Sequence, residues 1–312
     1  MIVKQNFNPV KVLGYIWREL LLGFAASLVV YVLYSVLGFS QTTLPTLFVV
    51  LMGLPLAIFV SFRSDLSYSR WEQAAEAWYH IVGSSRIFAR LVITFIESHM
   101  TSSSYDPQLA KVYQHQMIYR HLAWVNALRL QLRGESDDGI LKRFLSDQEF
   151  RELKSSSEIP MTNFLMKLQG TQIYQAMSSG ILQGFDSFQL ESHLGEFETL
   201  EATCDRIKNI QIPRQYDYFA RVFIYLFIIL VPLGFISSLA GIAWVIIPIT
   251  LIISAVFGVL ERMGLANESP FENRVTDVPL SALCVQIERE LRGELRESDL
   301  PPIAVPVDGY LW

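Results

Sequence analysis

Two long segments of this sequence contain no charged residue and no histidine. They cover residues 20–62 and 222–260. A helix needs about 20 apolar residues to cross a bilayer, so each segment is long enough for two crossings. Residues suited to turns stand near the middle of each segment, at 38–43 and at 237–241. The sequence therefore predicts four membrane spans, arranged as two helical hairpins.

The overall composition fits apolar spans joined to a polar remainder. Hydrophobic residues make up 51% of the chain and charged residues 18%, where a soluble domain is about a quarter charged. The net charge of −5 gives no reason to expect nucleic acid, which usually meets a basic face. Cys204 and Cys284 are the two cysteines, too few for a disulfide framework. As reduced thiols they agree with a cytosolic compartment.

The same distribution of charge predicts an orientation. Both hairpin turns lie inside uncharged segments, so all 25 lysines and arginines lie on the opposite side. The positive-inside rule then places both termini and the middle of the chain in the cytoplasm. We expect a multi-pass protein of the cell inner membrane, in contact with the lipid bilayer.

The rest of the chain has the spacing of amphipathic helices and no convincing strand alternation, which predicts an all-α fold. The helix expected over 279–297 carries dense charges that we assign to a solvated face. We expect an N-terminal cytosolic or interfacial helix at 1–19 and a transmembrane hairpin at 20–62. A cytosolic helical domain follows at 63–219, and a second transmembrane hairpin at 220–261. A cytosolic C-terminal helix with an extended tail occupies 262–312.

Patterns that carry chemistry are scarce. The five histidines do not combine into metal-ligand spacing, and His115 and His121 are interpreted as surface or packing residues. We find no phosphate-binding loop, nucleophile elbow or zinc-protease helix. The sequence thus favours a conduit or binding role over an enzyme, with no catalytic residue, no metal site and no cofactor.

The second predicted span carries one regular stripe. Leu54, Ile58 and Phe62 stand four residues apart, on one face of a helix, and Pro55 within the same span should loosen or kink it. Spacing alone favours contact with lipid or with another helix. The alternative is a hydrophobic constriction, in which copies of the stripe around a symmetry axis form stacked apolar rings.

Three motifs are similar to those of the bestrophin family of ion channels. Residues 62–71 resemble the bacterial signature Phe-Arg-Asn-Asn-x-x-Tyr-x-Arg, with Ser64 and Asp65 in place of the paired asparagines. Residues 204–213 resemble the family's Cys-Glu-Arg-Ile and Ile-Pro pair, and residues 269–280 resemble its Asp-Pro-Phe and Asn-Asp-Leu-Pro-Leu segment. The motifs occur in the family's order, with the four predicted spans between them.

This resemblance implies a homopentamer with one central pore, lined by the second span. By motif position the narrow neck falls on Leu54, Ile58 and Phe62, the residues of the stripe. A second constriction near the cytosolic exit falls on Phe188 by alignment from Cys204, although plain core packing is an equal alternative for Phe188.

Departures from the family pattern concern charge. Asp65, next to Arg63 at the expected inner mouth, either adds an acidic ring that attracts cations or forms a salt bridge with Arg63 or with an arginine of a neighbouring subunit. Animal bestrophins bind calcium just after the Pro-Phe pair. Here residues 272–277 offer two acids with Arg274 between them, whereas calcium needs six or more oxygen ligands. We therefore expect no tight calcium site.

The functional prediction is a channel for monovalent ions, with anion (chloride) conduction as the family's best-known activity. Aromatic ring edges carry partial positive charge and suit anions, but this neck has only one aromatic ring, Phe62, beside two aliphatic ones. With Asp65 nearby, the balance leans towards cations, so the sign of the permeant ion stays open. Two other classes compete: a membrane enzyme, for which the middle segment lacks convergent titratable residues, and a non-conducting scaffold or sensor.

Overall fold

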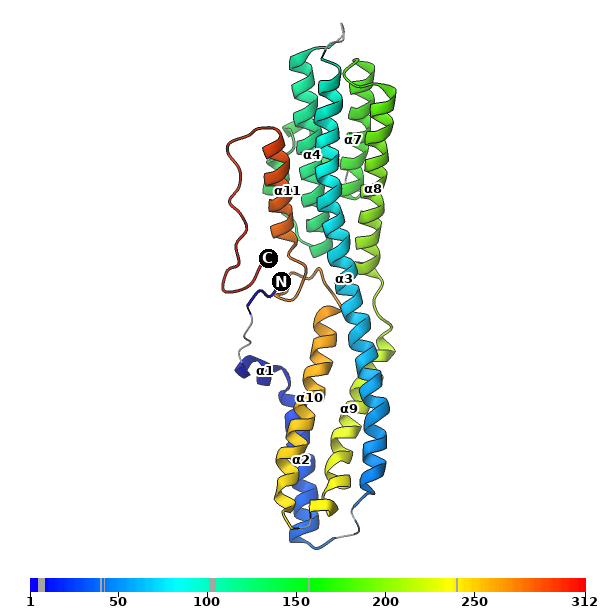
Figure 1. The fold of residues 1–312 in the computed structure, drawn as a ribbon, viewed down its shortest axis with the longest axis vertical. Helices are drawn as coiled ribbons and strands as arrows, with labels where there is room; N and C mark the ends of the chain where they lie inside the picture. The colour runs from blue at the N-terminus through cyan, green and yellow to red at the C-terminus, as the bar shows by residue number, and fades with distance from the viewer. Residues whose placement is uncertain (5–8, 40, 42, 101–104, 157, 240) are drawn as a thin grey trace. The chain divides into compact units, whose positions relative to one another are not determined.

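A computed structural model describes residues 1–4, 9–39, 41, 43–100, 105–156, 158–239 and 241–312. The fold is all-α (Figure 1), and the described residues form no strand beyond two isolated β-bridges. The elements are, in chain order, α1 (Pro9–Tyr15), α2 (Trp17–Tyr31), η1 (Val32–Val36), α3 (Thr46–Ser98), α4 (Pro107–Arg133), α5 (Asp138–Lys142), α6 (Asp147–Ser155), α7 (Met161–Ser178), α8 (Gly184–Asn209), α9 (Arg214–Phe235), η3 (Ser237–Leu239), η4 (Ala243–Val245), α10 (Ile246–Asn267) and α11 (Leu280–Glu294).

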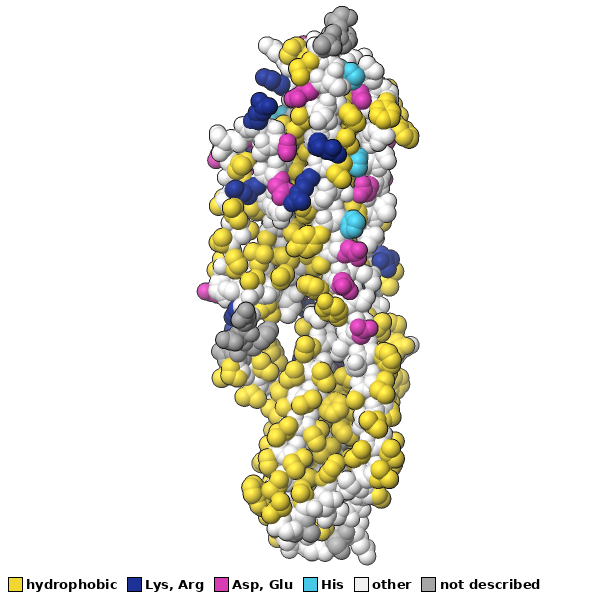
Figure 2. All heavy atoms as spheres, viewed as in Figure 1, with side chains coloured by type: hydrophobic (Ala, Val, Ile, Leu, Met, Phe, Trp, Pro, Cys, Tyr) yellow, Lys and Arg dark blue, Asp and Glu magenta, His cyan; other side chains and the backbone are white. Residues whose placement is uncertain are grey.

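The chain divides into two compact units. The membrane unit comprises residues 4–71 and 211–269, and the polar unit comprises residues 1–3, 72–210 and 270–312. Helix α3 contributes to both, since it continues unbroken from Thr46 to Ser98. On the face shown in Figure 2, hydrophobic side chains cover most of the membrane unit, while charged side chains gather on the polar unit.

Within the described residues, four helices are long and apolar enough to cross a membrane, as the uncharged segments predict. They are Trp17–Val36, the beginning of α3, α9, and Ala243–Asn267. Of the turn residues expected between them, Ser40, Thr42 and Ala240 lie outside the described residues. Among those described, Gly38 has a φ of 69°, a left-handed conformation that glycine adopts without strain.

Small residues let the spans of the membrane unit approach closely. A methyl group on Gly23 of α2 would lie 2.2 Å from Ser254 Oγ of α10, and one on Gly234 of α9 would lie 2.4 Å from Val49 of α3. Ser27 and Ser254 turn their hydroxyls back to carbonyls of their own helices, at 2.7 Å each. Such contacts stabilise helix pairs in lipid, where apolar burial alone gives little advantage.

The polar unit is built around α4, which packs on α7, α8 and α11. Asp106 caps its first turn by accepting from the backbone N–H of Gln108 at 2.8 Å, and Gly134 ends the helix with a φ of 65°. The later part of α3 joins this core through Phe88, whose ring centroid lies 5.9 Å from that of Phe197 in α8. Buried Leu190 and Leu194 lie on the same helix, as their spacing predicts.

The helix expected near the C-terminus is present as α11, but the prediction that its charges form a solvated face is wrong for Glu288. This side chain is buried, and its carboxylate receives Arg143 at 2.8 Å and Arg292 at 2.9 Å. Arg143, which follows α5, and Arg292 of α11 itself thus compensate a charge that sequence spacing alone assigned to water.

His121 is a packing residue, as predicted. Its Nε2 lies 2.8 Å from Ser85 Oγ, and its ring packs against those of Trp124 and Phe197. Complete burial lowers its pKa from 6.5 to about 3, because the charged imidazolium loses its hydration.

This burial predicts a loss of stability in mild acid. Between pH 6.5 and pH 3 the unfolded chain binds a proton at His121 that the folded chain does not, so stability falls by about 1.4 kcal/mol for each pH unit below 6.5. Thermal unfolding of the detergent-solubilised protein against pH measures this slope. His121→Phe should flatten it, whereas the matched change at exposed His115 should not. Equal slopes in the two variants would contradict the assignment.

Candidate functional site: the stripe on α3

Helix α3 presents a row of apolar side chains away from the rest of the membrane unit. Leu54, Ile58 and Phe62 are 58%, 57% and 67% exposed, while Leu56 and Val60 are 6% and 2% exposed. Residues two apart on a helix point about 200° apart. The stripe therefore lies opposite the buried side of α3, which packs on Ile224 and Ile228 of α9.

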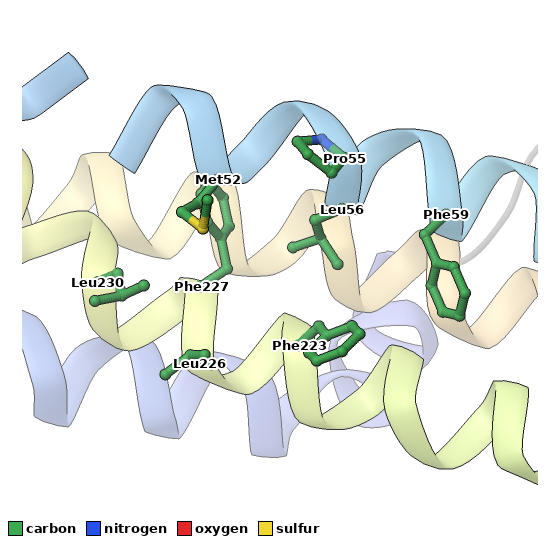
Figure 3. Close-up of a pocket in the computed structure, with 8 residues that line it drawn as sticks. All are labelled: Met52, Pro55, Leu56, Phe59, Phe223, Leu226, Phe227 and Leu230. Carbon is green, nitrogen blue, oxygen red and sulfur yellow. The ribbon is translucent and has the colours of Figure 1, made fainter. Parts of the chain in front are cut away.

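An apolar groove lies beside the stripe, between α3 and α9 (Figure 3). It encloses about 320 Å³. From α3 it is lined by Met52, Pro55, Leu56 and Phe59, and from α9 by Phe223, Leu226, Phe227 and Leu230. No stripe residue lines it, so the stripe and the groove are separate surfaces of one helix.

Arg63, expected at an inner mouth, is buried within the membrane unit. Its side chain is 3% exposed, and its guanidinium donates to Asp217 at the start of α9 through Nε and Nη2. Its Nη1 donates to the Glu261 carbonyl of α10 at 3.4 Å. The carboxylate that pairs with Arg63 within the chain is therefore Asp217 and not the neighbouring Asp65, whose side chain is exposed.

Two further buried carboxylates, Glu19 and Glu261, have arginine partners on the spans. Arg221 of α9 pairs with Glu261 of α10 at 3.0 Å. Glu19 of α2 is fully buried; it accepts from the Tyr225 hydroxyl at 3.3 Å and lies 3.9 Å from Arg262. Intramembrane charges are costly unless paired, and these pairs link α2, α9 and α10.

Sequence reasoning did not consider two exposed acids further along α3. Glu72 and Glu76 follow Asp65 by seven and eleven residues, and all three are exposed. These spacings correspond to about two and three helical turns. The four-residue period of the stripe continues to Leu66, Arg70 and Ala74 and does not reach these acids. The signal that could have found them is their spacing from Asp65.

Phe188, the expected second constriction, is 71% exposed near the beginning of α8. Phe188 is therefore not packed in the core of its own chain, which was the alternative to a role in the second constriction. Two residues earlier, Asp186 lies 2.7 Å from His99 Nε2 and accepts from the backbone N–H of Gln183 at 2.9 Å. These contacts hold the first turn of α8 that carries Phe188.

The segment that aligns with a calcium-binding run uses its acids internally. Glu272 receives Lys208 at 2.8 Å, a hydrogen bond that lowers the pKa of this carboxyl. Asp277 is buried, which raises its pKa, and it accepts from the backbone N–H of Arg274 at 3.0 Å. Within the described residues, no group of three or more acidic, histidine or cysteine side chains is arranged to hold a metal ion.

The fold and the α3 stripe define a multi-pass, all-α membrane protein. Residues 7–293 match the family model of the bacterial and fungal bestrophins. The chain therefore belongs to the bestrophin family.

Named relatives and solved structures agree with this assignment. The chain is 28% identical over 302 residues to the voltage-dependent anion channel-forming protein YneE of Salmonella typhi, covering 96% of this chain and 93% of the relative. It is 25% identical to the voltage-dependent anion channel-forming protein alr2987 of Nostoc, covering 90% and 87%. A crystal structure of a bacterial bestrophin homologue from Klebsiella pneumoniae shares the fold, with a TM-score of 0.78 at 24% identity and coverage of 91% and 100%.

Because Glu272 and Asp277 are used in contacts within the chain, we predict that calcium does not bind tightly to this segment. Calcium added to the purified protein should change neither its melting temperature nor its activity, because too few carboxylate oxygens are left to bind the ion. Differential scanning fluorimetry with magnesium as the matched control measures this. Stabilisation by micromolar calcium alone would contradict the prediction.

Proposed function

We propose that this chain is an ion channel that assembles as a homopentamer around one central pore. In this proposal α3 lines the pore, and Leu54, Ile58 and Phe62 form three stacked rings at its neck. The exposure of this stripe, opposite the buried face of α3, is the observation that carries the proposal. Copies whose stripes meet at an axis would shield the apolar side chains and create a narrow passage.

Apolar rings of this kind control ion conduction by determining whether water can fill the neck. A narrow hydrophobic constriction excludes water when closed, and ions cannot cross it without their hydration. Phe62 adds ring edges of partial positive charge, which suit anions. Phe188, exposed near the start of α8, is assigned to a second aperture towards the cytosolic exit. In this role the chain is not an enzyme and needs no cofactor.

The permeant ions are monovalent, with anions such as chloride as the first assignment. Its support is the naming of the relatives as anion channel-forming proteins. A monovalent cation channel of the same architecture is the second candidate. The exposed carboxylates of Asp65, Glu72 and Glu76 favour it, because acidic rings at a pore mouth attract cations.

The location follows the charge distribution. We place both termini in the cytoplasm and the four spans in the cell inner membrane, because the lysines and arginines lie outside the uncharged segments. The partners are then the other copies of the chain, the lipid bilayer and the permeant ions, with no nucleic acid.

The reversal potential in a planar bilayer under a potassium chloride gradient tests the proposal. Reversal near the chloride equilibrium potential is the expected result. Reversal near the potassium potential would instead support the cation channel, and Asp65→Asn should then shift it towards zero. No current from a demonstrated pentamer would favour a non-conducting scaffold or sensor.

The neck assignment makes a separate prediction. Ile58→Ala widens one ring and should raise the unitary conductance by roughly a factor of two or more, because the dewetting barrier falls steeply with pore width. Ile229→Ala is the matched control, since Ile229 is exposed on α9 and outside the stripe. Equal conductance in Ile58→Ala and in the unmodified protein would remove Ile58 from the neck.

A further inference from the structure

One buried guanidinium joins three spans directly beside the proposed neck. Arg63 follows Phe62 in α3 and is 3% exposed. It donates to the Asp217 carboxylate of α9 and to the Glu261 carbonyl of α10. A planar guanidinium with donors in a fixed fork holds its partners in a defined direction, which a lysine ammonium does not.

A glycine leaves the space in which this guanidinium lies. A methyl group placed on Gly264 of α10 would stand 2.8 Å from Arg63 Nη1 and 3.6 Å from Ser64 Oγ. Non-bonded carbon and nitrogen atoms repel each other at 2.8 Å, so a side chain at position 264 would have to displace the guanidinium of Arg63. Arg63, Asp217, Glu261 and Gly264 together form what we call the Arg63 socket.

The direction of Phe62 is tied to that of Arg63 by the geometry of the helix. Neighbouring residues on a helix project about 100° apart. With Arg63 held towards α9 and α10, Phe62 projects away from them, and its ring is 67% exposed. A rotation of this part of α3 would carry Phe62 out of the stripe and Arg63 out of its contacts together.

Pro55 limits how far such a rotation is transmitted. Proline has no N–H, so it removes one hydrogen bond from the preceding turn of α3. The helix is therefore less tightly coupled across Pro55 than beyond it. Phe62 and Ile58 lie on the same side of Pro55 as Arg63, and Leu54 lies on the other side.

We propose that the Arg63 socket is a positioning device for the neck, in which Arg63, Asp217 and Gly264 set the rotation of Phe62 about the α3 axis. The inference rests on the proposed function, because it assigns Phe62 to the pore. None of the three positioning residues contacts the permeant ion; they act through the phenyl ring.

The first experiment perturbs the socket without changing charge. Gly264→Ala should change the unitary conductance by about threefold or more, the range of coupling found between residues in contact. Gly258→Ala is the matched control on the same helix, since a methyl group there meets Ile16 and Glu19 of the α2 side at 3.2 to 3.4 Å. It should leave the conductance within about twofold. Equal changes in the two variants would overturn the proposal.

A double-mutant cycle separates positioning from general structural damage. If the socket acts through Phe62, Gly264→Ala and Asp217→Asn should each lose most of their effect in a Phe62→Ala background. An unchanged effect in that background would mean that the socket acts elsewhere. If Gly264→Ala and Asp217→Asn fail to assemble, Arg63→Lys keeps the charge and replaces them in the same cycle.

A thiol-modification assay reads the rotation whether or not the protein conducts. Cys204 and Cys284 are buried, so an engineered Phe62→Cys is the accessible target. Gly264→Ala should change its rate of reaction with a methanethiosulfonate reagent by about threefold, and the rate at Leu54→Cys by less. An unchanged rate at Phe62→Cys would overturn the inference even in a working channel. A changed rate without any current would uphold the control of Phe62 by the socket, while the channel function and the role of Phe62 in a neck failed.

Discussion

The Arg63–Asp217 ion pair is the contact on which the arrangement of the membrane unit depends. Charges buried among apolar spans are costly, and pairing on the inside of the bundle makes them tolerable. This pair joins α3 to α9, and the Glu261 carbonyl adds α10. The exposed face of α3 is then the face that no other span of the same unit covers.

Helix α3 gives the proposed pore two chemically different walls. Its apolar stripe ends at Phe62, and exposed acids follow at Asp65, Glu72 and Glu76. An apolar neck controls whether ions pass, and charged side chains beside it bias which ions gather there. Membership of the bestrophin family and the names of the relatives favour anions, while these carboxylates favour cations. In the proposed channel, Phe62 and the acids that follow it therefore act in opposite directions on the choice of ion.

Much of the fold could be predicted from the sequence because its signals are local. The four spans follow from hydropathy and the absence of charge, and the Leu54–Ile58–Phe62 row follows from helical periodicity. The helices of the polar unit were visible in their apolar spacing. The homopentamer, the neck rings and the Phe188 aperture were implied by family resemblance, and they stay predictions, since a single chain carries no neighbouring subunit.

The sequence by itself determined the class of protein: four spans, an all-α polar remainder and one apolar stripe on the second span. Only the tertiary structure decided which charges meet. Arg63 and Asp217 are 154 positions apart, and Glu288 is buried against Arg143, which follows the distant helix α5. Hydropathy and periodicity report how each residue relates to its neighbours along the chain. Ion pairing and exposure depend on which helices pack together, and no local pattern encodes that.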